Sequence, residues 1–293
     1  MAAQRPSRDA KPRRISGYGV GGVDAVLAVD AIAREAEELG RTAPDIAQLD
    51  ALAAGPPLLK VDALKAGYGK MEILHGLNVR VGKGQSLCVI GPNGAGKSTV
   101  LHSIYGLAHV MRGRVVIGDH DVNRMPSNRR LQQAGVAYLL QDNSVFPDMT
   151  VEENLWMGGY LLARPDEARQ RAESVLSKYE SLRNRRKQRA GALSGGERRL
   201  LEISRALIMD PQVLLIDEPS IGLEPRFIDM VFEILGELQR NEGKTIIMVE
   251  QNARKGLEFA DIGYVLVSGR LALAASGREL LEHPEVGRLF LGG

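Results

Sequence analysis

The sequence predicts an α/β fold of the P-loop NTPase class, and two observations support this. From Leu58 onward, short apolar runs rich in β-branched residues alternate with segments of helical pattern. One of these runs leads directly into the phosphate-binding pattern GxxxxGK[ST], and a helical pattern follows it. Such alternation is typical of a mostly parallel sheet covered by helices. The 293 residues suffice for one large domain or two small ones.

The composition is that of a globular protein and excludes several classes. Apolar residues make up 44%, charged residues 25% and aromatic residues 4%, with a formal net charge of +2. Balanced charge and few aromatic rings argue against a dedicated nucleic-acid binder, so no nucleic-acid partner is expected. The single Cys88 excludes an internal disulfide framework. We find no apolar run long enough to span a bilayer and no secretory signal, so membrane attachment would need another component.

Residues 1–57 are predicted to form an N-terminal extension, partly helical and weakly ordered, in front of a domain at 58–293. Apolar residues at three- and four-residue spacings predict an amphipathic helix over 25–39. A second, short helix is predicted over 45–54. The Gly-Pro-Pro sequence at 55–57 breaks any helix and marks the boundary.

Beyond this boundary, strands and helices are expected to alternate. The apolar runs predicted as strands are residues 86–90, 115–117, 135–140, 213–216, 245–249 and 262–267. Helices are predicted from Lys97 onward, over 151–163, and over 166–179, where Arg164 and Pro165 precede the first turn. The mostly helical stretch at about 148–208 interrupts the strand rhythm and indicates an inserted subdomain.

The phosphate-binding motif is the strongest functional signal in the chain. It comprises Gly91, Pro92, Asn93, Gly94, Ala95, Gly96, Lys97 and Ser98, and Thr99 follows it. The glycines allow backbone N–H groups to turn toward the β- and γ-phosphates, and the helix N-terminus adds its positive dipole end. Lys97 supplies a positive charge, and the Ser98 hydroxyl is placed to ligate Mg²⁺. We therefore expect a nucleoside triphosphate and Mg²⁺ to bind here, rather than a glycine-rich surface turn.

The strand predicted at 213–216 ends in two carboxylates, Asp217 and Glu218. Asp217 is expected beside the phosphate loop, where it holds the metal directly or through water. Glu218 is expected to point toward the γ-phosphate and to polarise the attacking water as the catalytic base. Any strand that leaves a core can end in an acid, so this pattern alone is a weak signal. Together with the phosphate loop it becomes a strong one.

A second anion-binding pattern, LSGGE at 193–197, precedes that strand. Ser194, Gly195 and Gly196 lie at the start of a helix expected to begin near Glu197, and such a helix N-terminus favours anions. One nucleotide does not need two sites of this kind. The pattern therefore favours a head-to-tail dimer, in which this loop closes over the γ-phosphate bound by the partner.

Together these motifs resemble the ATP-binding subunit of ABC transporters, over residues 58–293. The resemblance implies a RecA-like α/β core with a small antiparallel β portion, a helical insert, and ATP with Mg²⁺ as ligands. It also implies that Tyr68 stacks on adenine and that Gln141 contacts the metal and the attacking water. Residues 142–150, from Asp142 to Thr150, would contact transmembrane permease subunits, and residues 220–225 would cross the dimer interface.

A closer resemblance lies in the segments 151–155, 250–254 and 284–293. They are similar to the ATP-binding subunits of branched-chain amino acid importers, with the related amide and urea importers close by. Gln251 stands where most ABC ATPases carry a switch histidine. A glutamine hydrogen-bonds to a γ-phosphate but takes no proton near neutral pH, so the role of base falls more heavily on Glu218.

The resemblance thus implies an ATP-hydrolysing subunit that energises uptake of amino acids, branched-chain ones above all. It would be a peripheral protein on the cytoplasmic side of a bacterial inner membrane, paired with an identical or paralogous ATPase. The residues leave open the ATPase of a urea or amide importer, a soluble ABC ATPase without transport, and a protein that binds ATP without turnover. A P-loop GTPase or small-molecule kinase is a further alternative, but neither explains LSGGE. The solute and the role of residues 1–57 are open as well.

Overall fold

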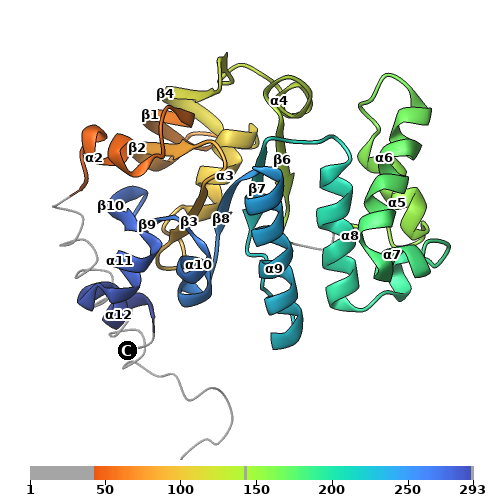
Figure 1. The fold of residues 1–293 in the computed structure, drawn as a ribbon. Coiled ribbons are helices and arrows are strands. Elements are labelled where there is room, and N and C mark those ends of the chain that lie inside the picture. Colours follow the sequence, from red (N-terminus) through yellow and green to blue (C-terminus); the bar gives the residue numbers. More distant parts are fainter. Residues whose placement is uncertain (1–42, 142–143, 292–293) are drawn as a thin grey trace, which may run out of the picture.

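The computed structural model describes residues 43–141 and 144–291, which form two sheets and the helices that cover them (Figure 1). The helix predicted over 25–39 lies outside the described residues. Figure 1 shows the antiparallel strands β1, β2 and β4 at one end of the molecule and the helices α5 to α8 at the other, with the core sheet between them. No helix among the described residues is long and apolar enough to cross a membrane.

The core sheet has six strands in the order β10-β9-β3-β8-β7-β6. Their bounds are β3 Ser86–Ile90, β6 Val136–Leu139, β7 Val213–Asp217, β8 Thr245–Val249, β9 Ile262–Val267 and β10 Arg270–Ser276. All neighbouring pairs are parallel except β9 with β10. Strands β3, β7, β8 and β9 are buried at every position, which explains why apolar runs alone predicted them.

The antiparallel sheet has four strands in the order β2-β1-β4-β5. Their bounds are β1 Pro57–Tyr68, β2 Met71–Gly82, β4 His109–Ile117 and β5 His120–Asp121. The strand predicted over 115–117 is the last part of β4. Strand β1 makes several register shifts against β2 and β4, and such bulges disturb the alternation by which a half-buried strand is predicted.

The predicted insert at about 148–208 consists of short helices. Their bounds are α5 Val151–Gly158, α6 Pro165–Lys178, α7 Glu180–Asn184, the 3₁₀ helix η2 Ala190–Ala192 and α8 Gly195–Leu207. The helix predicted over 151–163 is wrong for its last residues, because α5 ends at Gly158. A Cβ atom on Gly158 would lie 2.4 Å from the Arg205 carbonyl oxygen, so the chain passes close to α8 where α5 ends.

Hydrophobic clusters lie on both faces of the core sheet. The remaining helices are α3 Lys97–Tyr105, α4 Ser127–Ala134, α9 Pro225–Glu242, α10 Ala253–Phe259, α11 Gly277–Glu282 and α12 Pro284–Phe290. In β7, Leu214 and Ile216 pack in a cluster that includes α8 and α9, whereas Val213 and Leu215 pack in one that includes α3 and the antiparallel sheet. Because β3 and β7 both run parallel to β8, the residues that follow these two strands lie at a common edge of the sheet.

The short helix predicted over 45–54 is confirmed as α2, Ile46–Leu52, which Asp45 caps. Its Leu49 is fully buried in the cluster that contains β1 and β2. Asp50 accepts a hydrogen bond of 2.9 Å from the Arg80 guanidinium on β2. This helix therefore packs on the antiparallel sheet. The division into an extension at 1–57 and a domain at 58–293 stays a prediction.

Candidate nucleotide-binding and catalytic site

The phosphate loop connects β3 to α3, and glycine is required at two of its positions. Gly91 has a φ of +148°, and a Cβ atom there would lie 2.1 Å from the Leu266 carbonyl oxygen. Gly96 caps α3 in the left-handed conformation, with a φ of +95°. Between them, Asn93 and Gly94 are exposed and Ala95 is buried. The predicted strand, loop and helix thus form the arrangement that presents backbone N–H groups to phosphate.

Lys97 lies inside this loop and is only 8% exposed. Its Nζ donates hydrogen bonds to the carbonyl oxygens of Gly91, at 3.0 Å, and Pro92, at 3.1 Å. Burial lowers the pKa of Lys97, and the nearby carboxylates of Glu218 and Asp217 oppose this shift. The ammonium group is therefore held where the loop would surround a phosphate.

Both carboxylate oxygens of Asp217 have a hydrogen-bond donor. The Ser98 hydroxyl donates to Oδ1 at 3.1 Å, and the Tyr138 hydroxyl on β6 donates to Oδ2 at 3.0 Å. Asp217 ends β7 and is 3% exposed. Burial raises the pKa of Tyr138, so its hydroxyl keeps its proton. The structure brings Ser98 and Asp217 together, as the sequence predicts, and adds Tyr138.

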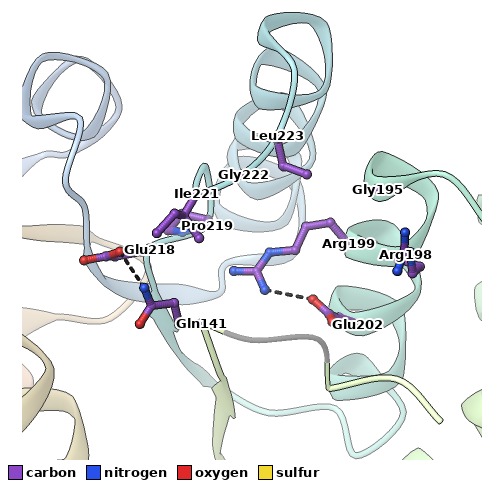
Figure 2. A pocket seen from close by; sticks show the side chains of 10 residues that line it. All are labelled: Gln141, Gly195, Arg198, Arg199, Glu202, Glu218, Pro219, Ile221, Gly222 and Leu223. Atoms are coloured by element: carbon purple, nitrogen blue, oxygen red, sulfur yellow. Dashed lines mark hydrogen bonds and ion pairs between the residues drawn. The ribbon is translucent and has the colours of Figure 1, made fainter. Parts of the chain in front are cut away.

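Glu218 and Gln141 also meet, from the ends of β7 and β6. Gln141 Nε2 donates a hydrogen bond of 2.9 Å to Glu218 Oε2 (Figure 2). Glu218 has a φ of +45°, uncommon for a residue with a side chain, and its N–H donates to the Val249 carbonyl oxygen at 2.9 Å. Burial and the neighbouring Asp217 raise the pKa of Glu218, while Lys97 lowers it. The strained backbone directs this carboxylate toward Gln141.

The residues at this edge have the ligand chemistry of a magnesium site. Mg²⁺ prefers oxygen ligands, and Ser98, Asp217 and Gln141 supply a hydroxyl, a carboxylate and an amide oxygen. The hydrogen bond from Gln141 to Glu218 is donated by the amide nitrogen. The amide oxygen of Gln141 takes no part in this bond and could ligate a metal ion. Asp217 is buried and negatively charged beside the ammonium group of Lys97. The donor set therefore fits the metal that the sequence predicts.

Tyr68 lies at the end of β1 and is 44% exposed. Its hydroxyl forms a hydrogen bond with Nδ1 of His102 on α3. The His102 ring lies 6.0 Å from the Tyr68 ring and 5.7 Å from the Tyr138 ring, centroid to centroid, with an edge toward each. No motif in the sequence indicates this position of His102 between two tyrosines. The exposed face of Tyr68 leaves room for the base stacking predicted there.

The second anion-binding pattern forms the start of α8. Ser194 is the N-cap, with Oγ accepting from the Glu197 N–H at 3.3 Å and Glu197 Oε2 accepting from the Ser194 N–H at 3.0 Å. The helix begins at Gly195, two residues before the predicted start. A Cβ atom on Gly196 would lie 2.1 Å from the Phe227 ring, so a larger residue there would force that ring to move.

A groove of about 390 Å³ joins this helix start to the predicted catalytic residues (Figure 2). Gly195 and Arg199 of α8 line it on one side, and Gln141 and Glu218 line it on the other. Figure 2 also shows Ile221 and Leu223, from the segment predicted to cross a dimer interface, along the same groove. The residues predicted to meet a partner thus adjoin those predicted to act on the nucleotide.

Gln251 is not brought into contact with the other predicted residues. It is exposed after β8, and its side chain forms no hydrogen bond to another residue of the described chain. Its neighbour Glu250, which sequence reasoning passed over, is 1% exposed. Glu250 Oε1 accepts hydrogen bonds from the Ser220 hydroxyl and from the Asn252 N–H, the latter at 3.1 Å. Glu250 therefore ties the segment after β8 to the segment after β7.

Tyr138 and Glu250 were missed for a reason that lies in the sheet. Tyr138 pairs with Leu215 in the β6–β7 register, which places it on the same face as Asp217. The strand itself can be predicted from its apolar run, but the register between two distant strands cannot be read from the sequence. For Glu250, the only signal is a carboxylate directly after an apolar strand, and this pattern does not reveal burial.

The sequence is similar to those of known proteins. The family model described as ABC transporter matches residues 74–221. The chain is 39% identical over 235 residues to a probable branched-chain amino acid transport ATP-binding protein, LivF, of Archaeoglobus fulgidus, covering 80% of this chain and 99% of that protein. It is 40% identical over 236 residues to the high-affinity branched-chain amino acid transport ATP-binding protein BraG of Pseudomonas aeruginosa, covering 80% and 100%.

Solved structures give the same fold. An ATP-binding cassette of an ABC transporter superimposes with a TM-score of 0.72 at 27% identity, covering 80% of this chain and 99% of that one. A second cassette, described as dimeric in a post-hydrolysis state with ADP and Pi, superimposes with a TM-score of 0.65 at 23% identity, covering 75% and 99%. The predicted fold class, a P-loop core with an antiparallel sheet and a helical insert, is confirmed.

Proposed function

The chain belongs to the ATP-binding proteins of ABC transporters, and on this premise we propose that it energises the uptake of branched-chain amino acids by hydrolysing Mg²⁺-ATP at the site described above. One observation gives the main support for hydrolysis at this site. Ser98, Gln141, Asp217 and Glu218, which come from three distant segments, lie in two hydrogen-bonded pairs at one sheet edge. Phosphoryl transfer needs this kind of positioning more than it needs covalent chemistry by the protein.

Each residue has a proposed part in the reaction. The loop amides and Lys97 bind the β- and γ-phosphates, and Tyr68 stacks on the adenine. Ser98, Asp217 and Gln141 would hold Mg²⁺, which when bound neutralises charge on the phosphates. Glu218 accepts the proton of the attacking water and is kept in place by its bond to Gln141. Gln251 hydrogen-bonds to the γ-phosphate, and its exposure leaves it free to do so.

Cassettes of this family dimerise and associate with permease subunits. For this chain we propose a head-to-tail dimer with an identical or paralogous ATPase. Ser194, Gly195 and Gly196 would face the nucleotide of the partner, because the N–H groups of the first turn of α8 favour an anion. The groove between α8 and Glu218 supports this, since it brings the helix start and the catalytic residues to one surface.

The permease contact is proposed for residues 142–150, of which 144–150 are described. Phe146 is 42% exposed there and Leu140, just before, is 44% exposed. The Arg205 guanidinium lies 5.4 Å from the Phe146 ring centroid and donates to the Ser144 carbonyl oxygen at 2.5 Å, so the segment is held in place with its apolar ring outward. Such a contact would place the protein at the cytoplasmic face of the membrane.

The proposed solute rests on the two relatives whose names describe branched-chain amino acid transport. It is tested by uptake of labelled leucine in a strain that lacks the gene, after complementation. The wild-type gene should restore uptake, and Glu218→Gln should not, whereas Glu233→Gln on an exposed position of α9 should behave as wild type. Undiminished leucine uptake in the deleted strain, with loss of urea uptake, would instead assign the protein to a urea importer.

A further inference from the structure

We propose that Tyr138 is a positioning residue for the metal site, holding the Asp217 carboxylate in the orientation that binds Mg²⁺. This inference rests on the proposed function of the same site. The sequence did not predict the contact of Tyr138 with Asp217. The two carboxylate oxygens are approached by different groups, Ser98 at Oδ1 and Tyr138 at Oδ2. Oδ1 is thus the oxygen that faces Ser98, one of the two other proposed metal ligands.

The Tyr138 hydroxyl is suited to support Asp217 rather than to replace the metal. A carboxylate only accepts hydrogen bonds, so the phenol must donate its proton to Oδ2. Among the described residues, Tyr138 is the only side chain that donates to this oxygen. Once Ser98 and Oδ1 turn to a metal ion, this bond is what keeps the plane of the carboxylate from rotating.

The Tyr138 ring is itself held on two sides. The His102 ring lies 5.7 Å from it, edge-on, and the Tyr105 ring lies 5.4 Å from it with the planes tilted by 42°. His102 in turn bonds to the hydroxyl of Tyr68. The backbone is fixed as well, because β6 pairs with β7 through Tyr138 and Leu215. A side chain so confined keeps its hydroxyl at Asp217, which a mobile surface tyrosine would not do.

A hydroxyl that supports Asp217 and a hydroxyl that competes with the metal for Asp217 have opposite effects on metal affinity. Hydrogen bonds to a ligating carboxylate commonly raise metal affinity, and their removal costs about 10- to 100-fold. If the hydroxyl instead occupied an oxygen that the metal needs, its removal would tighten metal binding. The two roles therefore predict opposite signs for a single substitution.

Tyr138→Phe removes the hydroxyl and retains the ring. Binding of a fluorescent, non-hydrolysable ATP analogue to the full chain is measured in EDTA and over a range of Mg²⁺ concentrations. We expect the metal-free affinity to stay within about twofold of wild type, which shows that the loop is intact. Mg²⁺ should increase the affinity for the analogue, and the Mg²⁺ concentration that gives half of this increase should be about tenfold higher, or more, than for wild type.

Tyr105→Phe is the matched control, since the Tyr105 hydroxyl forms no hydrogen bond to another described residue. It should leave the Mg²⁺ dependence unchanged. An unchanged or lower Mg²⁺ requirement in Tyr138→Phe would overturn the inference while leaving the proposed function intact. A wild-type protein whose nucleotide affinity does not respond to Mg²⁺ would overturn the metal site, and this inference with it.

Discussion

At the scale of single residues, the charge of Lys97 is the part of the site that the loop backbone cannot supply. Its ammonium group is nearly buried and is held by two carbonyl oxygens of the loop, Gly91 and Pro92, close to Asp217 and Glu218. In this position it would face a phosphate bound by the loop. Buried charges of this kind act in a low dielectric, where their effect on a bound anion is large.

Lys97→Ala should therefore abolish nucleotide binding, because the phosphates lose their only close cationic side chain on the loop. The measurement is a binding titration with a fluorescent ATP analogue. Lys83→Ala, at an exposed position between β2 and β3, is the control and should bind as wild type. Wild-type affinity of Lys97→Ala would contradict the assignment of the phosphate loop.

The buried Glu250 makes a prediction about pH. Burial raises its pKa above the ordinary value of 4.5, with the negative charge of Glu218 adding to the shift. The folded state thus binds this proton more tightly than the unfolded state. The stabilisation that follows is fully present below the unfolded pKa and is lost as pH rises through the folded pKa.

Glu250→Gln removes this titration and keeps an oxygen that accepts from Ser220 and Asn252. Relative to the variant, the wild type should lose free energy of unfolding as the pH rises above 4.5, the ordinary pKa of the group, and through the raised pKa of the folded state. Denaturant unfolding of both proteins at several pH values measures this difference. A difference that is constant with pH, or that changes in the opposite direction, would show that Glu250 is not the group responsible.

At the scale of elements, the helix α2 joins the segment before residue 57 to the antiparallel sheet. Leu49 is fully buried, whereas Ile46 on the same helix is 46% exposed. Leu49→Ala should lower the free energy of unfolding by about 2 kcal/mol or more, as is usual for a buried leucine, while Ile46→Ala should change it little. Chemical denaturation measures both. Equal stability of the two variants would mean that the α2 contact contributes nothing.

The elements that could be predicted are those whose sequence signal is local. Strands β3, β8 and β9 were predicted to the residue, because an apolar run is buried along its whole length. Strand β1 was not predicted, because its bulges break the alternation of inward and outward residues. The prediction of α5 ran too far, because nothing local shows that Gly158 meets α8.

The residues of the candidate site also divide into those with a local sequence signal and those without one. The phosphate loop, Asp217 and Glu218 could be predicted, since each lies within a short motif. Tyr138 and Glu250 could not, because their importance comes from the register of β6 on β7 and from a contact between two segments after separate strands. Pairing between distant segments is a property of the folded chain, and one sequence carries no record of it.

At the scale of the whole molecule, one protomer presents two half-sites. The phosphate loop with Lys97 lies between β3 and α3, and the N-terminus of α8 lies beyond the groove that Glu218 and Gln141 line. In the proposed dimer, a triphosphate bound to the loop of one copy would also contact the start of α8 in the other copy. ATP should therefore act as the link between two protomers, and hydrolysis should release them.

The proposed ATP-linked dimer can be measured as the mass of the Glu218→Gln protein in solution with saturating ATP and Mg²⁺. This variant should bind ATP without hydrolysing it, so light scattering should report a dimer. The same protein without nucleotide, and the double variant Lys97→Ala/Glu218→Gln with nucleotide, should both remain monomeric. A Glu218→Gln protein that stays monomeric with Mg²⁺-ATP bound would contradict the dimer, and one that hydrolyses ATP at the wild-type rate would contradict the role of Glu218 as the base.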